Sequence, residues 1–304
     1  MKFDSDVKLS KFISKIENQH IESLRELELE FSQKGKRAQV IGITGPPGAG
    51  KSTLTNKLIS ALVKKGKVAV IAVDPASLFT DGALLGDRIR MQEHANNPDV
   101  FIRSLSNRNA LGGLSAATGD IIKVFDIAGF EFIIVETVGV GQDEIDIVKY
   151  SDTVVLVLNP AGGDDMQAMK AGIMEIADVF VVNKADLKNE AEKTFNIINY
   201  WIKMNEKEWE PPVIKTNALE GNGVDELVSN IVRHKHFFDN NRKAYEKRIF
   251  LKAKHELMQK IFLVINKKLE TNAPEYFKTG IESIVNGKSE PLNEAEKILK
   301  GVLK

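Results

Sequence analysis

The chain has 304 residues with 42 basic and 42 acidic side chains, so its formal net charge is zero. Zero net charge argues against a protein that binds nucleic acid through a global basic field. The lack of cysteine excludes disulfides, thiolate nucleophiles and cysteine-ligated metal centres. No apolar run approaches the about 18 residues of a membrane span, and the charged start MKFDSDVKLS lacks the apolar core of a signal peptide. We therefore expect a cytoplasmic protein with neither a nucleic-acid nor a membrane partner.

Residues 1–36 are predicted to be helical, because apolar side chains recur among charged ones every three or four residues. Seven short, β-branched apolar runs follow, most of them separated by amphipathic stretches. These runs span residues 39–44, 67–73, 99–104, 131–137, 153–159, 179–184 and 212–217. Strands buried on both faces that alternate with helices predict an α/β fold with a mostly parallel sheet. Ligands of such sheets bind beyond the carboxyl ends of the strands.

The strand pattern stops after about residue 225, and a long helix with one apolar stripe is predicted between Tyr245 and Leu269. Two partners for this stripe are open: a second subunit, or the N-terminal helices. The many basic residues of the helix indicate either an acidic partner or a solvated face. Gly280, Asn286–Gly287 and Pro291 predict that the tail is divided into short helices.

The segment GPPGAGKS at residues 45–52 fits the phosphate-binding pattern G-x-x-x-x-G-K-[ST] between a predicted strand and a predicted helix over 54–64. Its glycines allow backbone N–H groups to face phosphate oxygens, and the helix N-terminus adds partial positive charge. Lys51 is expected to reach the β- and γ-phosphates, and the Ser52 hydroxyl to ligate Mg²⁺. The expected nucleotide contacts in this P-loop are Gly45, Pro46, Pro47, Gly48, Ala49, Gly50, Lys51, Ser52 and Thr53.

The sixth apolar run ends in Asn183-Lys184-Ala185-Asp186, which fits the guanine motif N-K-x-D. The Asp186 carboxylate can accept hydrogen bonds from guanine N1–H and the 2-amino group, whereas adenine lacks both donors. A site built this way rejects the wrong base, because its polar groups would stay unpaired. A second base-contacting loop is expected one strand later, at Asn217, Ala218 and Leu219. The pattern predicts that GTP and GDP bind in preference to ATP.

Three carboxylates are candidates for the magnesium site. Asp74 directly follows the second run, Asp87 lies in LGDRIR, and Glu136 follows the apolar residues 132–135 of the fourth run, where GTPases place a metal-binding acid. We expect Ser52 to ligate Mg²⁺ directly, Glu136 and Asp74 to lie close or act through water, and Asp87 to enter with GTP. The alternatives are that Asp74 caps a turn before Pro75 and that Asp87 caps a helix.

The hydrolytic residues are harder to identify. Val140 stands where many GTPases carry a glutamine, and Gln142 comes two residues later, so slow intrinsic hydrolysis is predicted. Help is expected from Gln142, from Lys170 or from a partner that orders the switch segments. Lys170 follows a loop rich in Gly and Asp and has a plain surface lysine as its alternative. The predicted catalytic residues are Lys51, Asp87, Glu136, Gln142 and Lys170.

Taken in order, the motifs resemble those of the MeaB/ArgK branch of the SIMIBI-class P-loop GTPases, the GTPases associated with methylmalonyl-CoA mutase. They are GPPGAGKST, AVDPAS, LGDRIRM, RSLSNR with LGGLSAAT, FIIVETVGVGQDE, AGGDDMQAMKAGIMEIAD and NKADL. The resemblance is dense over residues 38–235. It implies a homodimeric GTPase chaperone that gates delivery of adenosylcobalamin to an acyl-CoA mutase, protects that mutase and helps to eject damaged cofactor. It also implies that Asp74, Asp87 and Glu136 are magnesium-site acids, and that residues 161–172 form a mobile loop.

Two other classes of protein compete with this interpretation. A metal-delivery GTPase would need a cluster of cysteine or histidine ligands, but the only short histidine motif is His234-Lys235-His236, which is interpreted as a solvated helix end. An ATPase or kinase linked to amino-acid transport conflicts with the guanine motif. The predicted organisation is an N-terminal helical extension over 1–36, a P-loop GTPase domain over 37–235 and a C-terminal helical dimerisation arm over 236–304.

Overall fold

The structure is a computed structural model that describes residues 3–35, 37–74, 92–94, 96–106, 117–137, 143–160, 172–205, 207–272 and 274–302. The chain divides into two compact units, Met1–Arg248 and Ile249–Lys304. The predicted organisation into residues 1–36, 37–235 and 236–304 stays a prediction.

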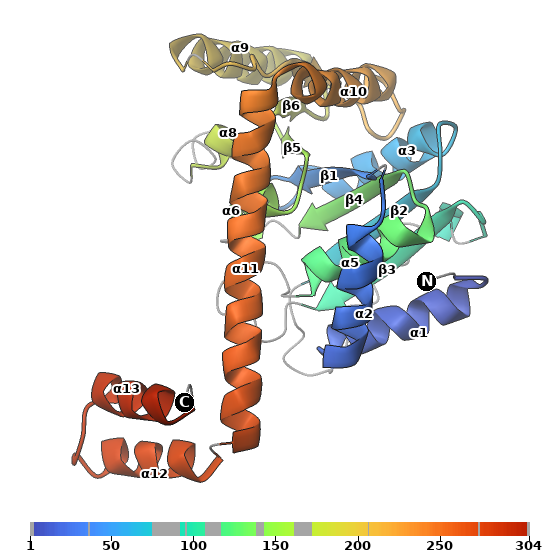
Figure 1. The fold of residues 1–304 in the computed structure, drawn as a ribbon. Coiled ribbons are helices and arrows are strands. Elements are labelled where there is room, and N and C mark those ends of the chain that lie inside the picture. Colours follow the sequence, from blue (N-terminus) through green and yellow to red (C-terminus); the bar gives the residue numbers. More distant parts are fainter. Residues whose placement is uncertain are drawn as a thin grey trace. The chain divides into compact units, whose positions relative to one another are not determined.

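Seven strands form the sheet of the first unit, in the order β3-β2-β4-β1-β5-β6-β7 (Figure 1). The strands are β1 (Gln39–Thr44), β2 (Val68–Asp74), β3 (Val100–Ser106), β4 (Phe132–Thr137), β5 (Thr153–Leu158), β6 (Val179–Val182) and β7 (Val213–Lys215). Every pairing is parallel, which confirms the α/β prediction and makes the sheet wholly parallel in its described strands. Each of the seven predicted runs corresponds to one strand, with ends shifted by no more than two residues.

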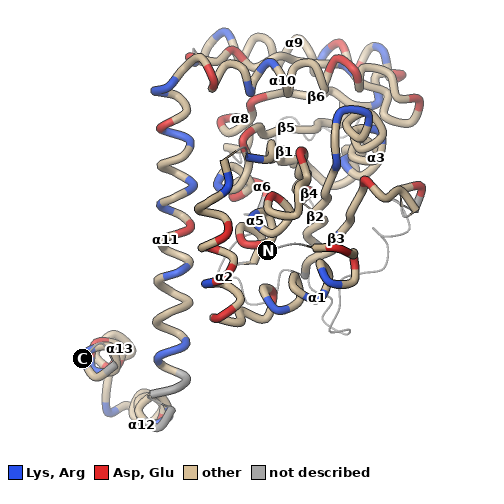
Figure 2. Tube along the Cα trace, turned by 45° about the vertical axis from the view of Figure 1, so that its right-hand side comes forward, with Lys and Arg blue, Asp and Glu red and all other residues tan. Residues whose placement is uncertain are grey.

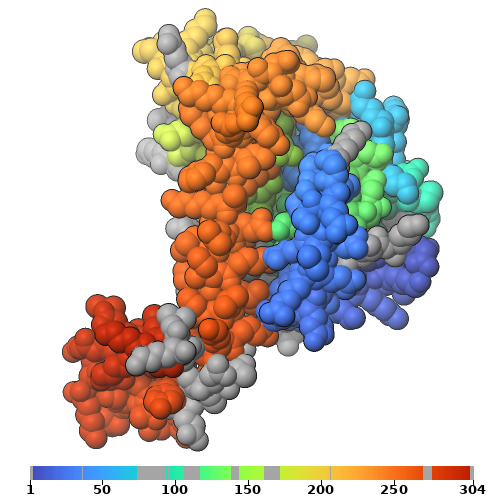
Figure 3. All heavy atoms as spheres, viewed as in Figure 1, coloured from blue at the N-terminus to red at the C-terminus, as the bar shows by residue number. Residues whose placement is uncertain are grey.

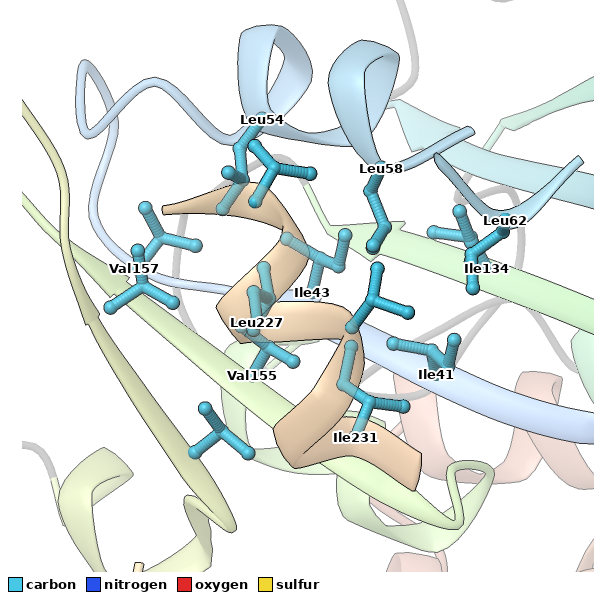
Figure 4. Close-up of a cluster of buried hydrophobic side chains, with 14 of the residues drawn as sticks. Ile41, Ile43, Leu54, Leu58, Leu62, Ile134, Val155, Val157, Leu227 and Ile231 are labelled. Atoms are coloured by element: carbon cyan, nitrogen blue, oxygen red, sulfur yellow. The ribbon is translucent and has the colours of Figure 1, made fainter. Parts of the chain in front are cut away.

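The core lies where helices cover a sheet whose strands are buried on both faces. All six residues of β1 and of β5 are buried, which explains why the apolar runs are continuous rather than alternating. Helices α3 (Lys51–Leu62) and α10 (Val224–Asn240) pack over these strands, with Leu58 and Leu227 among the side chains between them (Figure 4). Helix α9 (Lys188–Met204) packs through Ile198 on a second cluster that contains Phe180.

The N-terminal segment, predicted to be helical over residues 1–36, forms two helices. These are α1 (Asp6–Glu17) and α2 (Ile21–Ser32), and Gln19, with a φ of +53°, marks the turn between them. Both helices contact α5 (Thr118–Ala128), and Arg103 of β3 forms an ion pair with Glu17. Figure 3 shows the blue N-terminal helices at the surface of the first unit. They therefore belong to the same compact body as the sheet.

Four short helices complete the described part of the first unit. They are η1 (Gln92–His94), α6 (Asp143–Asp146), η2 (Ile147–Lys149) and α8 (Ile173–Ile176). Helix α6 follows β4 in the sequence, and α8 leads into β6. Both are therefore connected to strands whose carboxyl ends lie on the ligand-binding side of the sheet.

The predicted long helix is α11 (Arg242–Asn272), which begins in the first unit and ends in the second. Figure 2 shows Lys and Arg along much of its length. Helices α12 (Pro274–Val285) and α13 (Pro291–Val302) follow. Gly280 was predicted to break this tail but lies inside α12, where a Cβ atom would be 3.3 Å from Ile298 Cδ1 of α13. The glycine thus allows close helix packing instead of ending a helix. No described helix is both long enough and apolar enough to cross a membrane.

Candidate functional site

The P-loop joins the carboxyl end of β1 to α3 and depends on its glycines. Gly45, Gly48 and Gly50 have φ values of +140°, +77° and +88°, in a region that side chains rarely adopt. A Cβ atom on Gly45 would lie 2.1 Å from the Val157 carbonyl oxygen. Gly50 is also the N-cap of α3 and makes no side-chain capping bond. The backbone N–H groups of the first turn are therefore suited to an anion.

Lys51 is folded back onto the loop that it follows. Its Nζ donates hydrogen bonds of 2.6 Å to the Gly45 carbonyl and 3.0 Å to the Pro46 carbonyl, and the residue is only 6% exposed. The ammonium is thereby held at the loop, close to the helix N-terminus. Phosphate oxygens bind an ammonium more strongly than neutral carbonyls do, so this arrangement fits the phosphate contact predicted for Lys51.

Ser52 and Glu136 meet between α3 and β4. The Ser52 hydroxyl donates a 2.6 Å hydrogen bond to Glu136 Oε1, and Glu136 is 6% exposed. The strand register pairs Glu136 with Ala72, so Asp74 ends the neighbouring strand two residues further along. Hydroxyl and carboxylate oxygens are ligands that Mg²⁺ prefers. The residues present therefore fit the predicted magnesium site, while Asp87 lies outside the described residues.

Asn183 connects the guanine motif to the rest of the site. Its Nδ2 donates a 2.9 Å hydrogen bond to the Ala49 carbonyl of the P-loop. Its Oδ1 accepts hydrogen bonds from Thr216 Oγ1 at 3.0 Å and from the Ala218 backbone N–H at 3.1 Å. Asn183 is 2% exposed, and its side chain is held by the P-loop and by residues 216–218 at once. Thr216 was not among the predicted site residues, although its place directly after β7 could have indicated it.

The two loops predicted to contact the base lie beside each other. The Ala185 N–H donates a 3.0 Å hydrogen bond to the Thr216 carbonyl, and Lys184 has a φ of +55° that turns the chain after β6. Asp186 is exposed, and no residue in the described ranges donates a hydrogen bond to its carboxylate. Ala218 is buried at 2% exposure, whereas Leu219 is 79% exposed. This arrangement leaves the Asp186 oxygens available to a ligand.

The predicted residues fall into two groups. The structure brings the P-loop, Lys51, Ser52, Glu136 and Asn183 together at the carboxyl ends of β1, β4 and β6. The other predicted hydrolytic residues, Asp87, Gln142 and Lys170, lie outside the described residues, as do 161–171 of the predicted mobile loop. The roles assigned to both groups from the sequence stay predictions.

The histidine motif near the end of α10 differs from its prediction in part. His236 is exposed, as expected of a solvated helix end, but His234 is 1% exposed. Its Nδ1 lies 2.9 Å from Thr153 Oγ1, and its Nε2 lies 3.5 Å from Asp178 Oδ1. The two histidines therefore lie in opposite environments. Within the part of the chain that the structure describes, no group of three or more His, Cys, Asp or Glu could hold a metal ion.

Comparison with known proteins identifies the family. The sequence profile of the methylmalonyl Co-A mutase-associated GTPase MeaB matches residues 9–273. The chain belongs to this family. A Pyrococcus horikoshii protein with a provisional GTPase assignment is 46% identical to this MeaB-family chain over 301 residues, which is 97% of this chain and 94% of the relative.

Two further relatives and one solved structure extend the comparison. GTPase ArgK of Escherichia coli is 39% identical over 201 residues, which covers 64% of this chain and 61% of ArgK. The mitochondrial methylmalonic aciduria type A homolog of Mus musculus is 32% identical over 263 residues, covering 83% of this chain and 60% of the relative. The crystal structure of an LAO/AO transport system kinase aligns with a TM-score of 0.62 at 21% identity, covering 99% of this chain and 100% of that one. This last likeness supports the fold alone.

Fold, motifs and family agree on the activity. The MeaB-family chain is a P-loop GTPase, and its N-K-x-D sequence directly follows β6.

Proposed function

We propose that this MeaB-family GTPase is a chaperone that gates the loading of adenosylcobalamin into an acyl-CoA mutase, such as methylmalonyl-CoA mutase, and protects that mutase. The family match over residues 9–273 carries the proposal, because the family is described by its association with that enzyme. The similarity to the mouse methylmalonic aciduria type A homolog supports the same assignment.

The proposed site binds GTP or GDP together with Mg²⁺. Lys51 and the P-loop amides hold the phosphates, while Asn183 and Asp186 select guanine, with the segment 217–219 beside them. Ser52 and Glu136 supply oxygens for Mg²⁺, which neutralises phosphate charge when it is bound. Asp74 and Asp87 complete the proposed acidic set. Intrinsic hydrolysis is slow, and Gln142 or Lys170 takes part when a partner is bound.

We further propose a homodimer formed through the C-terminal arm. Apolar side chains of α11 beyond Arg248 are exposed at four- and seven-residue spacing along the helix. They include Phe250, Leu257, Met258, Ile261 and Phe262, which are 41–71% exposed. An apolar stripe of this kind normally marks a protein interface. The proposed domain organisation is therefore 1–36, 37–235 and an arm over 236–304.

The proposal is tested by GTPase assays on the full chain with and without an acyl-CoA mutase from the same organism. We expect the mutase to bind in a nucleotide-dependent manner and to raise the hydrolysis rate by at least about tenfold, which is less than the about 10³-fold that an arginine supplied by a partner can contribute. A chain that hydrolyses GTP but neither binds nor responds to any such mutase would remove the chaperone assignment and leave the GTPase activity intact. Light scattering of the free chain tests the dimer, and a monomer at micromolar concentration would contradict it.

Two measurements separate the alternatives from the proposed function. Equal affinity for ATP and GTP by calorimetry would favour the ATPase or kinase interpretation. Binding of nickel or cobalt ions by the chain alone would favour metal delivery to another metalloenzyme. We expect neither result.

A further inference from the structure

Two buried threonines connect three parts of the nucleotide site. Thr137 Oγ1 donates a 3.2 Å hydrogen bond to Thr44 Oγ1, and Thr44 Oγ1 donates a 3.2 Å hydrogen bond to the Glu144 carbonyl. Thr44 is 0% exposed and Thr137 is 1% exposed. Neither hydroxyl is needed to complete the P-loop or guanine motif, and neither was predicted from the sequence as a site residue.

The two threonines lie at the ends of two neighbouring strands, next to proposed site residues. Thr44 is the last residue of β1, directly before Gly45 of the P-loop. Thr137 is the last residue of β4, directly after Glu136. Glu144 lies in the first turn of α6. The two hydroxyls therefore link the strand end that carries the phosphate loop, the strand end that carries the metal-site acid and the start of the next helix.

The direction of the hydrogen bonds makes the two threonines interdependent. A hydroxyl has one proton to donate, and Thr44 donates its proton to the Glu144 carbonyl. The Thr44 oxygen can then only accept, and Thr137 supplies the proton. The Ile43 carbonyl, 3.5 Å from Thr137 Oγ1, is a longer acceptor for that proton. Removing the Thr44 hydroxyl takes a donor from the Glu144 carbonyl, and removing the Thr137 hydroxyl takes a donor from the buried Thr44 oxygen.

Helix α6 is short enough for one such bond to affect its position. It has four residues, so it contains little internal hydrogen bonding of its own. The carbonyl that Thr44 engages belongs to its first turn. The start of α6 directly follows Gln142 in the sequence, and Gln142 itself lies outside the described residues.

We infer that Thr44 and Thr137 are positioning residues for GTP hydrolysis, which hold the start of α6 in register with the P-loop and with Glu136. Neither hydroxyl hydrogen-bonds to a proposed phosphate or base contact, so the two threonines govern the hydrolysis rate more than the nucleotide affinity. The inference rests on the proposed nucleotide site, because the position of α6 relative to the P-loop and Glu136 affects catalysis only when GTP is bound there.

The test uses Thr137→Val, which keeps the shape of the side chain and removes the hydroxyl, and Thr137→Ser, which keeps the hydroxyl. Single-turnover hydrolysis and GTP affinity are measured on the full chain. We expect Thr137→Val to lower the rate at saturating GTP about tenfold, the size of effect that one buried hydrogen bond carries, with GTP affinity changed less than about twofold. Thr137→Ser should restore most of the rate.

A matched control is available in α3. The Thr55 hydroxyl is buried and makes no hydrogen bond with any described residue, so Thr55→Val removes a buried hydroxyl without breaking a connection. Its hydrolysis rate should equal that of the wild type. The double variant Thr44→Val/Thr137→Val should be no slower than either single variant, because both belong to one chain of hydrogen bonds.

Several outcomes would overturn the inference. A wild-type rate in Thr137→Val would do so, and so would equal losses of rate in Thr137→Val and Thr55→Val, which would indicate a general packing effect. If Thr137→Val does not fold, Thr44→Val tests the same connection from its other end. Failure of the wild-type chain to bind GTP would instead overturn the proposed nucleotide site, so the two failures are distinguishable.

Discussion

The Ser52 hydroxyl donates a 2.6 Å hydrogen bond to Oε1 of Glu136 and so joins the first turn of α3 to the end of β4. This contact brings together two oxygens that the sequence predicts for one magnesium ion. Because the Glu136 carboxylate is buried, its charged form is stabilised by a neighbouring hydrogen-bond donor or cation.

The first prediction concerns the magnesium requirement. Ser52→Ala and Glu136→Gln should each raise the Mg²⁺ concentration needed for half-maximal GTP binding by about 10–100-fold, the range found when groups of a metal site are removed. The measurement is a Mg²⁺ titration with a fluorescent GTP analogue. Ser60→Ala is the control, because that α3 hydroxyl bonds only to the Asn56 carbonyl and the His94 ring in the described structure. An unchanged Mg²⁺ dependence in both site variants would argue against the predicted metal ligands.

The second prediction concerns base selection. Asp186→Asn replaces an acceptor carboxylate with an amide that presents a donor to guanine N1–H. GTP affinity should fall by about 100-fold or more, because the amide keeps one acceptor without the charge and sets a donor against the other guanine donor, while xanthosine triphosphate affinity should rise. Calorimetric titration with GTP and with xanthosine triphosphate measures the two affinities. Glu190→Gln, an exposed carboxylate in the first turn of α9, should leave both affinities unchanged. Equal loss of both nucleotides in Asp186→Asn would show that the residue acts in another way.

The third prediction concerns the close approach of the P-loop to β5. Gly45→Ala would place a Cβ atom 2.1 Å from the Val157 carbonyl oxygen at a φ of +140°. We expect a loss of about 1–3 kcal/mol in the free energy of unfolding from the backbone strain, with a further loss from the steric clash. Urea denaturation provides the measurement. Gly35→Ala has no heavy atom within 4 Å of the added Cβ and should unfold like the wild type. Wild-type stability in Gly45→Ala would contradict the close packing of this loop against β5.

The fourth prediction concerns pH. Burial lowers the pKa of His234 below its ordinary value of 6.5, the Asp178 carboxylate opposes this shift, and the Arg248 guanidinium adds to it. His234 is thus neutral in the folded chain at a pH where it already binds a proton in the unfolded chain. Its contribution to stability is present above about pH 6.5 and is lost as the pH falls below that value.

The measurement for this fourth prediction is the free energy of unfolding at about pH 7.5 and about pH 5.5, on either side of the ordinary histidine pKa. The wild type should lose more stability on acidification than His234→Gln does. His236→Gln removes an exposed histidine of the same helix and should keep the wild-type pH dependence. If the free energy of unfolding fell by the same amount between the two pH values in all three chains, His234 would not contribute to the loss of stability in acid.

Much of the fold was predictable because its signals are local. The strands of the parallel sheet are buried on both faces, so each appears as a continuous apolar run of the right length. The P-loop and the guanine motif could also be recognised in the sequence, because phosphate binding by the backbone and base recognition each require particular residues at fixed spacing. Their placement at the same edge of the sheet follows from the topology of parallel strands.

Other features depend on contacts between distant segments and carry no local signal. His234 follows the pattern of a helix end, yet Thr153 and Asp178, which are far from it in the sequence, lie against its buried ring. Glycine usually weakens a helix, but Gly280 lies inside α12 and leaves room for the Ile298 side chain of α13 to pack closely against that helix. The hydrogen bond between Thr137 and Thr44 could likewise not be predicted from the sequence, because it depends on how β1 and β4 are aligned in the sheet.

The side chain of Asn183 has a consequence for the release of nucleotide. One buried amide holds the Ala49 carbonyl on the phosphate side and the Thr216–Ala218 segment on the base side. A movement of either segment must break or carry along this amide, so the proposed phosphate contacts and the proposed base contacts are mechanically coupled. In the proposed nucleotide site, a protein that moved the exposed Leu219 loop would therefore disturb the P-loop without contacting it.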